Sequence, residues 1–372
     1  MLDIKVVKQK LGVCIGRFSM PHNEHVRMLR QMAEENDHVL VLVGSANRRK
    51  SNKNPFSFDE RARMLNKIFQ DLIVPDLKHN AMFTAVPLSD TLYNETRWEA
   101  KVQQLVDAYS EDADIPESSV TLYGCDKDES TYYLRNFPQW KHRDHGKLVD
   151  IDATRLRDAW FNTDQITVFG FGNEQYLEIL DKHLPSSVYM YLRDRPYDPN
   201  VQADWQYYKD EEVKFRDYPY PETLTFTCAD AVLECAGHVL CVTRNAAPGI
   251  GCLALPGGFK NRGENLVDAA IRETFEETNL RIPQRVMKNC VRGSHLFDHP
   301  SRSNGIPRIT YATHFKIEPR ENGSLPRAKG GDDAKNDHLP NGGCVWVPIG
   351  DILAGKVIMY DDHADIVEYF VK

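Results

Sequence analysis

The stretch that most restricts the fold of this chain runs from residue 258 to residue 280 and reads GFKNRGENLVDAAIRETFEETNL. From residue 265 onward it contains no Gly or Pro, and its residues favour a helix. The residues at 266, 269 and 270 are apolar and begin a stripe on one face of that helix. Three glutamates continue the stripe: Glu273, Glu276 and Glu277. Because carboxylates so close together repel one another, this face predicts a bound cation, and oxygen ligands suit Mg²⁺ or Mn²⁺.

Three glutamates by themselves are explained more simply by an acidic helix face in solvent. The neighbouring residues change that balance, because Gly258, Glu264 and Arg272 stand at characteristic offsets from the glutamates. The spacing G-x5-E-x7-R-E-x2-E-E resembles the signature of the Nudix hydrolases, which cleave nucleoside diphosphates linked to another group. Two positions differ from that signature, since Thr274 replaces an aliphatic residue and Asn279 replaces a glycine. Asn is the next best residue for a left-handed helix end, so the second difference is mild.

The resemblance to the Nudix hydrolases implies a metal site in this stretch. Its cofactor would be Mg²⁺, with Mn²⁺ as an alternative, and the catalytic residues would be the three glutamates of the stripe. Arg272 would orient one of them. The implied metal ligands are Gly257, Glu264, Glu273, Glu276 and Glu277. A late loop often supplies the general base in this family, which makes Asp332 and Asp333 candidates, although two ordinary loop aspartates are the simpler explanation.

Length and composition limit the class of protein. A chain of 372 residues is long for a single core, so we expect two domains. A net charge of −8 argues against binding of nucleic acid by bulk electrostatics, so substrate anions must be met by local basic residues or by metal. Eight cysteines form no CxxC pair, which indicates reduced thiols and a cytoplasmic protein. No signal core or membrane-spanning run occurs, so we expect no membrane partner, and a homo-oligomer stays open.

The N-terminal residues have the pattern that opens a doubly wound α/β domain. Residues 11–15 predict a buried strand, a glycine turn follows, and residues 26–35 predict a helix before a second strand at 38–44. Ligands of such domains bind beyond the carboxyl ends of the strands. His22 and His25 lie three residues apart at the start of this helix, where phosphate oxygens are favoured. Metal ligands or surface residues are the alternatives for two histidines at this spacing.

The fuller string G-R-F-x-x-x-H-x-x-H resembles the (H/T)xxH site of the nucleotidyltransferases. The resemblance implies that His22, His25 and Arg157 are catalytic, binding the ATP triphosphate and stabilising charge by position and electrostatics. The second motif of that family usually reads S-x-T-x-x-R, and residues 151–157 keep Thr154 and Arg157. Asp152 stands in the serine position. A carboxylate is unfavourable at a phosphate site, so either Asp152 turns outward or phosphate binding is weaker.

Further residues are candidates for nucleotide and substrate binding. Residues 54–61, NPFSFDER, predict a helix with a capping box and are typical of archaeal-type NMN adenylyltransferases. By resemblance to these enzymes, Trp98 would stack on the nicotinamide ring, whereas its position alone indicates a helix residue facing the core. Lys127 and Asp128 follow a predicted strand at 120–124, and a polar loop explains them nearly as well. The full set of candidates is Gly16, Arg17, Phe18, Arg48, Asp90, Asn94, Trp98, Lys127, Asp128 and Thr154.

Both motif sets occur in this order in the bifunctional nicotinamide-nucleotide adenylyltransferase/Nudix hydrolases, and the resemblance covers nearly the whole chain. It implies an α/β protein with a doubly wound Rossmann-like nucleotidyltransferase domain at residues 1–193, a linker at 194–216 and an α/β/α Nudix domain at 217–372. The implied substrates are ATP and NMN, which give NAD and pyrophosphate, and ADP-ribose, which gives AMP and ribose 5-phosphate. Two alternatives stay open: another acceptor such as phosphopantetheine, or a Nudix domain that senses ADP-ribose or NAD without hydrolysis.

Overall fold

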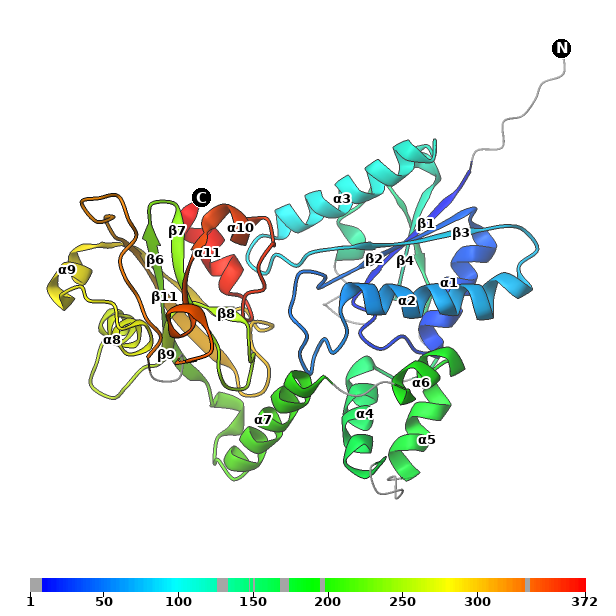
Figure 1. Cartoon of the computed structure of the whole chain (residues 1–372). Coiled ribbons are helices and arrows are strands. Elements are labelled where there is room, and N and C mark those ends of the chain that lie inside the picture. Colours follow the sequence, from blue (N-terminus) through cyan, green and yellow to red (C-terminus); the bar gives the residue numbers. More distant parts are fainter. Residues whose placement is uncertain are drawn as a thin grey trace, which may run out of the picture. The chain divides into compact units, whose positions relative to one another are not determined.

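The structure is a computed structural model that describes residues 9–125, 133–146, 148–149, 151–167, 174–194, 198–331 and 335–372. The chain divides into two units, Met1–Asp198 and Pro199–Lys372, which are described here one at a time (Figure 1). Four of the candidate site residues, Lys127, Asp128, Asp332 and Asp333, lie outside the described residues.

The first unit is built on a parallel sheet of five strands in the order β3-β2-β1-β4-β5. The strands are β1 (Leu11–Gly16), β2 (His38–Val43), β3 (Met82–Pro87), β4 (Val120–Gly124) and β5 (Lys141–Asp144). The chain starts in the middle, moves outward to β3 and then crosses to the other side of β1, which is doubly wound topology. The fold predicted for this half is confirmed. All the carboxyl ends of the strands meet at one edge, where Gly16 pairs with Val43.

Helices cover both faces of this sheet. Alternate residues of β1 and β2, such as Val13 and Leu40, pack in one cluster with Val102 and Val106 of α3, while α1 and α2 lie against the opposite face (Figure 1). The helices are α1 (Asn23–Glu35), α2 (Phe58–Ile68), α3 (Glu95–Asp112), α4 (Ala153–Thr167), α5 (Glu174–His183) and α6 (Ser186–Arg193). A π-helical turn (Phe69–Ile73) and short 3₁₀ turns (Val74–Asp76 and Glu117–Ser119) complete this unit.

The second unit contains a mixed sheet in the order β10-β11-β6-β7-β12, with the short strands β8 and β9 paired to β7 and β6. Strands β6 and β11 are parallel, and the other pairs are antiparallel. The strands are β6 (Phe226–Cys235), β7 (His238–Thr243), β8 (Leu253–Ala254), β9 (Gly257–Phe259), β10 (Val291–Phe297), β11 (Arg308–Lys316) and β12 (Cys344–Pro348). The hairpin predicted around Ala236 and Gly237 is confirmed, and both residues have positive φ.

Figure 1 shows α8 and α11 on opposite sides of this sheet, which gives the α/β/α arrangement predicted for the second half. Alternate residues of β6 (Ala229, Ala231 and Leu233) form the core with Ala269 and Ala270 of α8. The helices are α7 (Pro199–Phe215), α8 (Leu266–Thr278), α9 (Gln284–Asn289), α10 (Ile349–Leu353) and α11 (His363–Val371), with 3₁₀ turns at Pro221–Thr223 and Pro340–Gly343. Helix α7 lies within the stretch expected to be a linker, and it belongs to the second unit.

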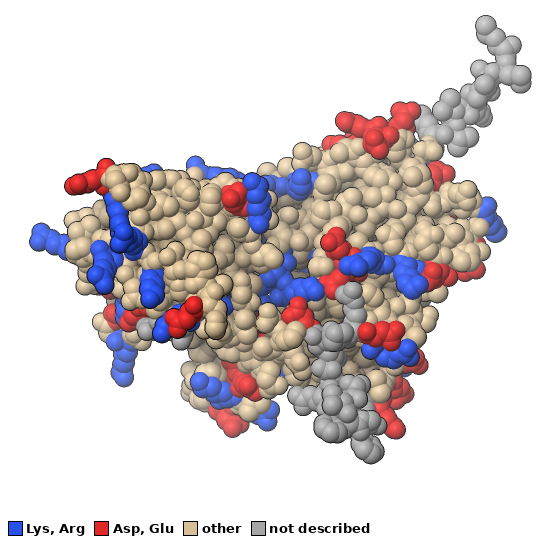
Figure 2. Space-filling view, viewed as in Figure 1, with Lys and Arg blue, Asp and Glu red and all other residues tan. Residues whose placement is uncertain are grey.

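The surface of each unit carries both signs of charge. In Figure 2 the Lys and Arg side chains of the visible face are interspersed with Asp and Glu. Anionic ligands would therefore be met by local groups rather than by a broad field. Among the described residues, no helix has the length and apolar character needed to cross a membrane.

Candidate active sites

The two histidines of the first unit come together where β1 ends. Strand β1 stops at Gly16, and His22 is the N-cap of α1. The rings of His22 and His25 stack with their centroids 3.8 Å apart, and the His22 backbone N–H donates to Nδ1 of His25 at 3.2 Å. Between them and the strand, Phe18 takes a left-handed backbone conformation (φ 48°) and places its buried ring 4.9 Å from His25. The imidazoles therefore lie at the ligand-binding edge expected for this sheet.

Arginine side chains lie near this edge. Arg157 on α4 is only 6 % exposed and donates to the Thr154 hydroxyl at 3.0 Å. Burial foremost, together with the nearby Arg17, lowers the pKa of Arg157 to about 10, against the opposing effect of Asp158 and Asp152. Two buried or crowded guanidinium groups repel one another, so this arrangement favours an anionic ligand between them.

Asp152 takes a structural position that its sequence context did not reveal. Its carboxylate is exposed and accepts the backbone N–H of Arg155 at 2.8 Å, three residues further on. Asp is among the best residues at a helix N-cap, and α4 begins at the next residue, Ala153. The carboxylate in the serine position of the motif therefore caps α4, and its exposure agrees with the alternative in which the side chain turns outward.

Arg61 is a residue that the sequence analysis did not place in the site. It is 1 % exposed and donates to the carbonyl oxygens of Arg17 (2.6 Å), Gly44 (2.7 Å) and Ser45 (3.3 Å). It thereby ties together the chain segments that leave β1 and β2. Burial foremost lowers the pKa of Arg61 to about 10. A signal was present, because Arg61 stands on the apolar face of α2 with Met64, Leu65 and Ile68, where a charge needs a specific partner.

The residues proposed to bind the acceptor nucleotide lie in two different places, at the strand ends and on α3. Asp90 accepts the Ser45 N–H at 3.0 Å and forms an ion pair with Arg48 at 3.5 Å. Asn94 is the N-cap of α3 and accepts the Arg97 N–H at 2.9 Å. Trp98 is half-buried, packs against the core and meets Tyr133 edge-on at 5.6 Å. Asp90 and Arg48 thus lie at the strand ends, whereas the contacts of Asn94 and Trp98 are those of residues that build α3.

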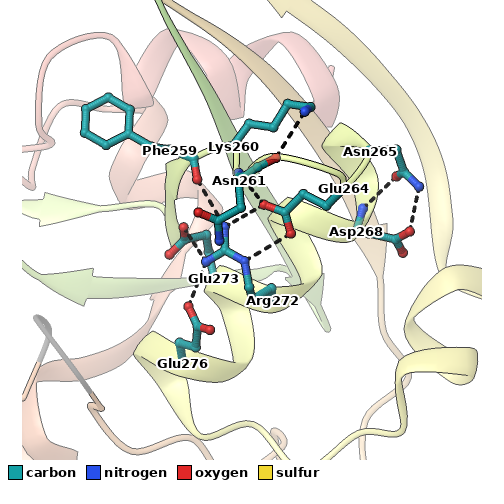
Figure 3. Close-up of polar contacts among 9 residues, drawn as sticks. All are labelled: Phe259, Lys260, Asn261, Glu264, Asn265, Asp268, Arg272, Glu273 and Glu276. Carbon is teal, nitrogen blue, oxygen red and sulfur yellow. Dashed lines mark hydrogen bonds and ion pairs between the residues drawn. The ribbon is translucent and has the colours of Figure 1, made fainter.

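In the second unit, Arg272 gathers the acidic side chains of the motif (Figure 3). It donates to Glu264 at 2.9 and 3.1 Å, to Glu273 at 2.8 Å and to Glu276 at 2.8 Å. It also donates to the Phe259 carbonyl oxygen at 3.1 Å. The hydrogen bond from Arg272 lowers the pKa of Glu264, and the carboxylates together raise the pKa of Arg272, Glu264 foremost. The sequence motif is therefore one connected network around a guanidinium group.

Glu277 lies apart from that network and is half-buried. It accepts the Gly257 N–H at 3.1 Å. Burial, with the Glu273 and Asp230 carboxylates nearby, raises the pKa of Glu277 to about 8. A side chain at Gly257 would collide with Asp230, and a Cβ at Gly258 would lie 2.5 Å from the Glu273 carboxylate, so both glycines permit close approach of the acids.

The helix that carries these residues forms as predicted. α8 begins after Asn265, which accepts the Asp268 N–H at 2.9 Å as N-cap. It ends at Asn279 in the left-handed conformation (φ 46°, ψ 31°), which confirms the expectation for this residue. Thr274, the other departure from the motif, is fully buried and donates its hydroxyl to the Ala270 carbonyl, so its polarity is satisfied within the helix.

A cavity of about 470 Å³ opens beside these residues. Gly257, Glu273 and Glu277 line it, whereas Glu264 and Glu276 are not among its lining residues. Several lining residues were not named from the sequence: Asp230, Arg244, Arg302, Arg308, Tyr360 and His363. The one clear signal for any of them was Asp230, an acid in the otherwise apolar stretch of β6. The others lie in loops or at strand ends, where spacing carries little information.

The donor set of this cavity fits a divalent cation. Within the described residues, no three His, Cys, Asp or Glu side chains already converge as a ready metal site, and Arg272 binds three of the motif glutamates, Glu264, Glu273 and Glu276. Glu277 nevertheless keeps a half-buried carboxylate that takes part in no ion pair in the described part of the chain. A cation beside it would offset the cost of burial, and carboxylate oxygens are the ligands preferred by hard divalent ions.

The segment that leads to the two general-base candidates packs against the end of α8. The Lys329 N–H donates to the Thr278 carbonyl at 2.8 Å, and the Gly331 N–H donates to the Glu277 carbonyl at 2.9 Å. A side chain at Gly331 would collide with the Glu276 carbonyl, so glycine allows this approach. The described chain therefore reaches the glutamates at the residue that precedes Asp332.

Helix α7 forms part of the wall of the cavity. Tyr207 lines it, and the fully buried Asp204 accepts the Gly249 N–H at 2.8 Å. Glu211, 8 % exposed, pairs with Arg308 and accepts the Ile306 N–H at 3.1 Å. Tyr207 also borders a neighbouring cavity of about 670 Å³ between α7 and the start of β6. The stretch expected to be a linker therefore holds two loops of the second site.

Family comparisons agree with this division. Residues 13–105 match the family described as cytidylyltransferase-like, and residues 225–370 match the NUDIX domain. The fold and the two sites thus define an enzyme that joins a nucleotidyltransferase half to a Nudix half. The chain is 31% identical over 185 residues to the nicotinamide/nicotinic acid mononucleotide adenylyltransferase of Acinetobacter baylyi, which covers 49% of this chain and 91% of that protein. It is 31% identical over 124 residues to the nicotinamide-nucleotide adenylyltransferase of Methanocorpusculum labreanum, over 30% of this chain and 70% of that protein.

The chain belongs to the nicotinamide mononucleotide adenylyltransferase family, in the form that carries a Nudix domain. A solved structure of a bifunctional NMN adenylyltransferase/ADP ribose pyrophosphatase from Francisella tularensis matches with a TM-score of 0.77 and 26% identity, over 98% of each chain. A second structure of that protein, in complex with AMP and a manganese ion, matches with a TM-score of 0.76 and 25% identity, again over 98% of each chain. The family resemblance expected from the sequence motifs is confirmed.

Proposed function

We propose that the first half transfers the adenylyl group of ATP to NMN, and that the second half hydrolyses ADP-ribose to AMP and ribose 5-phosphate. One observation carries the first assignment: the stacked His22 and His25 rings lie at the carboxyl edge of a parallel sheet, with Arg17 and Arg157 sharing that site. The likeness over the whole chain to the Francisella tularensis protein supports the pairing of the two activities.

In the adenylyl transfer, a phosphate oxygen of NMN attacks the α-phosphorus of ATP. The bond between this phosphorus and the bridging oxygen breaks, and pyrophosphate leaves with that oxygen. His22, His25 and the two arginines donate hydrogen bonds to phosphate oxygens as their negative charge shifts toward pyrophosphate. Such a reaction needs positioned cations rather than a protein nucleophile. The Thr154 hydroxyl, which accepts from Arg157, keeps that guanidinium oriented.

In the hydrolysis, a water oxygen attacks one phosphorus of the diphosphate, and the bond to the bridging oxygen breaks. Glu273 and Glu277 are the lining residues that would hold the divalent cations, Mg²⁺ or Mn²⁺, with Glu264, Glu276 and the Gly257 carbonyl as further candidates. Metal at this position supplies charge neutralisation and a more acidic water. Arg272 orients the glutamates through its ion pairs. Asp332 and Asp333 are candidates to accept the proton from water, supported by the packing of Gly331 on α8.

Product analysis of the purified full chain tests both assignments. One sample contains Mg²⁺, ATP and NMN, a second replaces NMN by nicotinic acid mononucleotide or phosphopantetheine, and a third contains Mg²⁺ and ADP-ribose. We expect NAD and pyrophosphate from the first sample and equal amounts of AMP and ribose 5-phosphate from the third. Product from phosphopantetheine with none from NMN would overturn the first assignment. Tight binding of ADP-ribose in a titration with no AMP formed would overturn the second in favour of a sensor domain.

A further inference from the structure

The cavity of the second half is lined by four arginines that differ in whether a carboxylate of the chain pairs with them. They are Arg244, Arg272, Arg302 and Arg308. Three of them are already neutralised by carboxylates of the chain. Arg272 pairs with the motif glutamates, Arg302 pairs with the fully buried Asp362 at 2.8 Å, and Arg308 pairs with Glu211. Arginines in such pairs shape the wall of the cavity and have little charge left for a ligand.

Arg244 differs from these three arginines. It is half-buried and follows directly on strand β7. Its Nε–H donates to the Pro248 carbonyl at 2.7 Å, and its guanidinium carbon lies 4.2 Å from the centroid of the Tyr360 ring. Among the described residues, no carboxylate lies within ion-pair distance of Arg244 and no acceptor takes its Nη hydrogens, although its charge acts at longer range on Glu277 and partly offsets the rise in the pKa of that carboxyl. A cation that is partly desolvated and has no direct ion pair attracts an anionic ligand strongly.

The backbone holds Arg244 in this place. Its N–H donates to the Cys252 carbonyl at 2.9 Å, and its carbonyl accepts the Gly251 N–H at 2.8 Å, which closes the turn between β7 and β8. Asp204 of α7 accepts the Gly249 N–H at 2.8 Å, which fixes the tip of the same turn. With the guanidinium over the Tyr360 ring and Nε–H bonded to the Pro248 carbonyl, the two Nη groups are the donors left for the cavity. Such a side chain loses little conformational entropy when it binds.

We propose that Arg244 is a substrate-binding residue of the second half, whose Nη groups bind phosphate oxygens of the nucleoside diphosphate while the acidic residues on the same cavity hold the cation. This rests on the proposed function of the second half. The diphosphate then lies between a fixed protein cation and the metal site. Arg244 contributes in the same way to any ligand of this cavity that carries a diphosphate or a terminal phosphate.

The test compares Arg244→Ala, Arg244→Lys and Arg285→Ala in the full chain. Arg285, an exposed arginine on α9 and outside the cavity lining, is the matched control. A hydrogen bond to a charged group contributes about 1.5–3 kcal/mol, so Arg244→Ala should raise KM for ADP-ribose about 10- to 150-fold. Lys keeps the charge but loses the planar fork and the stacking on Tyr360, so it should restore KM only in part. NAD formation by the same protein reports that the chain is folded, and it should be unchanged.

Two further readouts separate phosphate binding from a structural role. The inhibition constant of ADP for ADP-ribose hydrolysis should rise in Arg244→Ala about as much as KM, whereas that of adenosine should stay at its wild-type value. Equal losses for ADP and adenosine, or an unchanged KM, would overturn the proposal. If wild-type protein forms no AMP, the proposed hydrolysis fails by itself. Calorimetric titration with ADP-ribose in EDTA then decides about Arg244, because wild-type affinity in Arg244→Ala would refute the contact and a loss of at least tenfold would support it.

Discussion

At the first site the groups whose charged form burial disfavours are the cations Arg61 and Arg157, whereas at the second site such a group is the carboxylate Glu277. Burial lowers the pKa of Arg61 and of Arg157 to about 10, whereas burial raises the pKa of Glu277 to about 8. In each case the protein makes the charged form of its own group less favourable and so favours a ligand of the opposite sign. Under the proposed function, the first half would therefore bind phosphate directly, and the second half would bind a divalent cation that in turn holds phosphate. The two sites thus act on similar phosphate groups with protein charges of opposite sign, arginines at the first site and carboxylates at the second.

The comparison is tested most strongly by Glu277→Gln, which removes the anion of the second half. We expect hydrolysis of ADP-ribose to fall about 10³-fold, the upper range for losing one electrostatic contributor. The free energy of unfolding should not decrease, because a neutral amide avoids the cost of burying a carboxylate. The measurement is the rate of AMP formation with NAD formation as internal control. Full hydrolysis by this variant would show that the Glu277 carboxylate is not needed for the activity of the second half.

The converse change removes donors of the first half. His22→Ala and His25→Ala should each reduce adenylyl transfer on the order of 10²-fold, the effect of losing one transition-state donor. ADP-ribose hydrolysis should be unaffected. Rates of NAD formation at saturating ATP and NMN provide the measurement. Wild-type turnover in both variants would exclude the imidazoles from the site.

The arginines of the second half that pair with carboxylates of the chain should contribute to its stability. Glu211→Gln leaves Arg308 without its buried carboxylate, and breaking a buried pair costs about 3 kcal/mol. The neighbouring Glu212→Gln is the matched control, since that carboxylate is 67% exposed and pairs with Lys209 at the surface. Calorimetry should show a lower free energy of unfolding for Glu211→Gln than for Glu212→Gln. The loss of ADP-ribose hydrolysis on heating provides a second measurement of the same difference. Equal stability of the two variants would contradict a structural role for the pair of Glu211 and Arg308.

Metal should stabilise the second half in the absence of nucleotide. A ligand present at 100 times its dissociation constant stabilises the folded state by about 2.7 kcal/mol, so Mg²⁺ or Mn²⁺ should raise the melting temperature of wild-type protein. The shift should disappear after EDTA and in Glu277→Gln. An identical shift in wild type and variant would place the metal elsewhere.

The smallest effect is expected at Asp152, the carboxylate in the second phosphate motif of the first half. Ser caps helices about as well as Asp, so Asp152→Ser should change the free energy of unfolding by less than about 0.5 kcal/mol, while Asp152→Ala should lose about 1 kcal/mol. Adenylyl transfer should change by only a few-fold in the Ser variant, because the side chain of Asp152 serves α4. Urea unfolding and the KM for ATP check both statements. A large fall in this KM for Asp152→Ser would show that the carboxylate repels phosphate.

Much of the fold could be predicted from local patterns. The strand, turn and helix at the N-terminus, the hairpin around Ala236 and the helix α8 with its left-handed end at Asn279 all follow from short-range preferences. Strand β5 could not be found this way. Its residues, KHRD, are charged and exposed, since it is the edge strand of the parallel sheet.

The candidate sites were predictable only where chemistry and spacing coincide in one segment. Arg272 and its glutamates lie on one helix and its preceding loop, so their contacts could be predicted from the sequence. The pair Arg302–Asp362 joins residues far apart in the chain, and the position of Arg244 depends on a turn held by Asp204. Such contacts come from the tertiary fold, which no local pattern reports. Asp152 was ambiguous because the same carboxylate suits a helix cap and disfavours a phosphate site.

The packing of α7 defines which piece of this gene can be passed to another protein intact. A recombination point just after Phe215 would leave the turn at Gly249 and the side chain of Arg308 without their acceptors Asp204 and Glu211. A point before Pro199 keeps both acceptors with the loops that they hold. A second half transferred to another protein therefore keeps the acceptors of its own loops only when α7 is transferred with it.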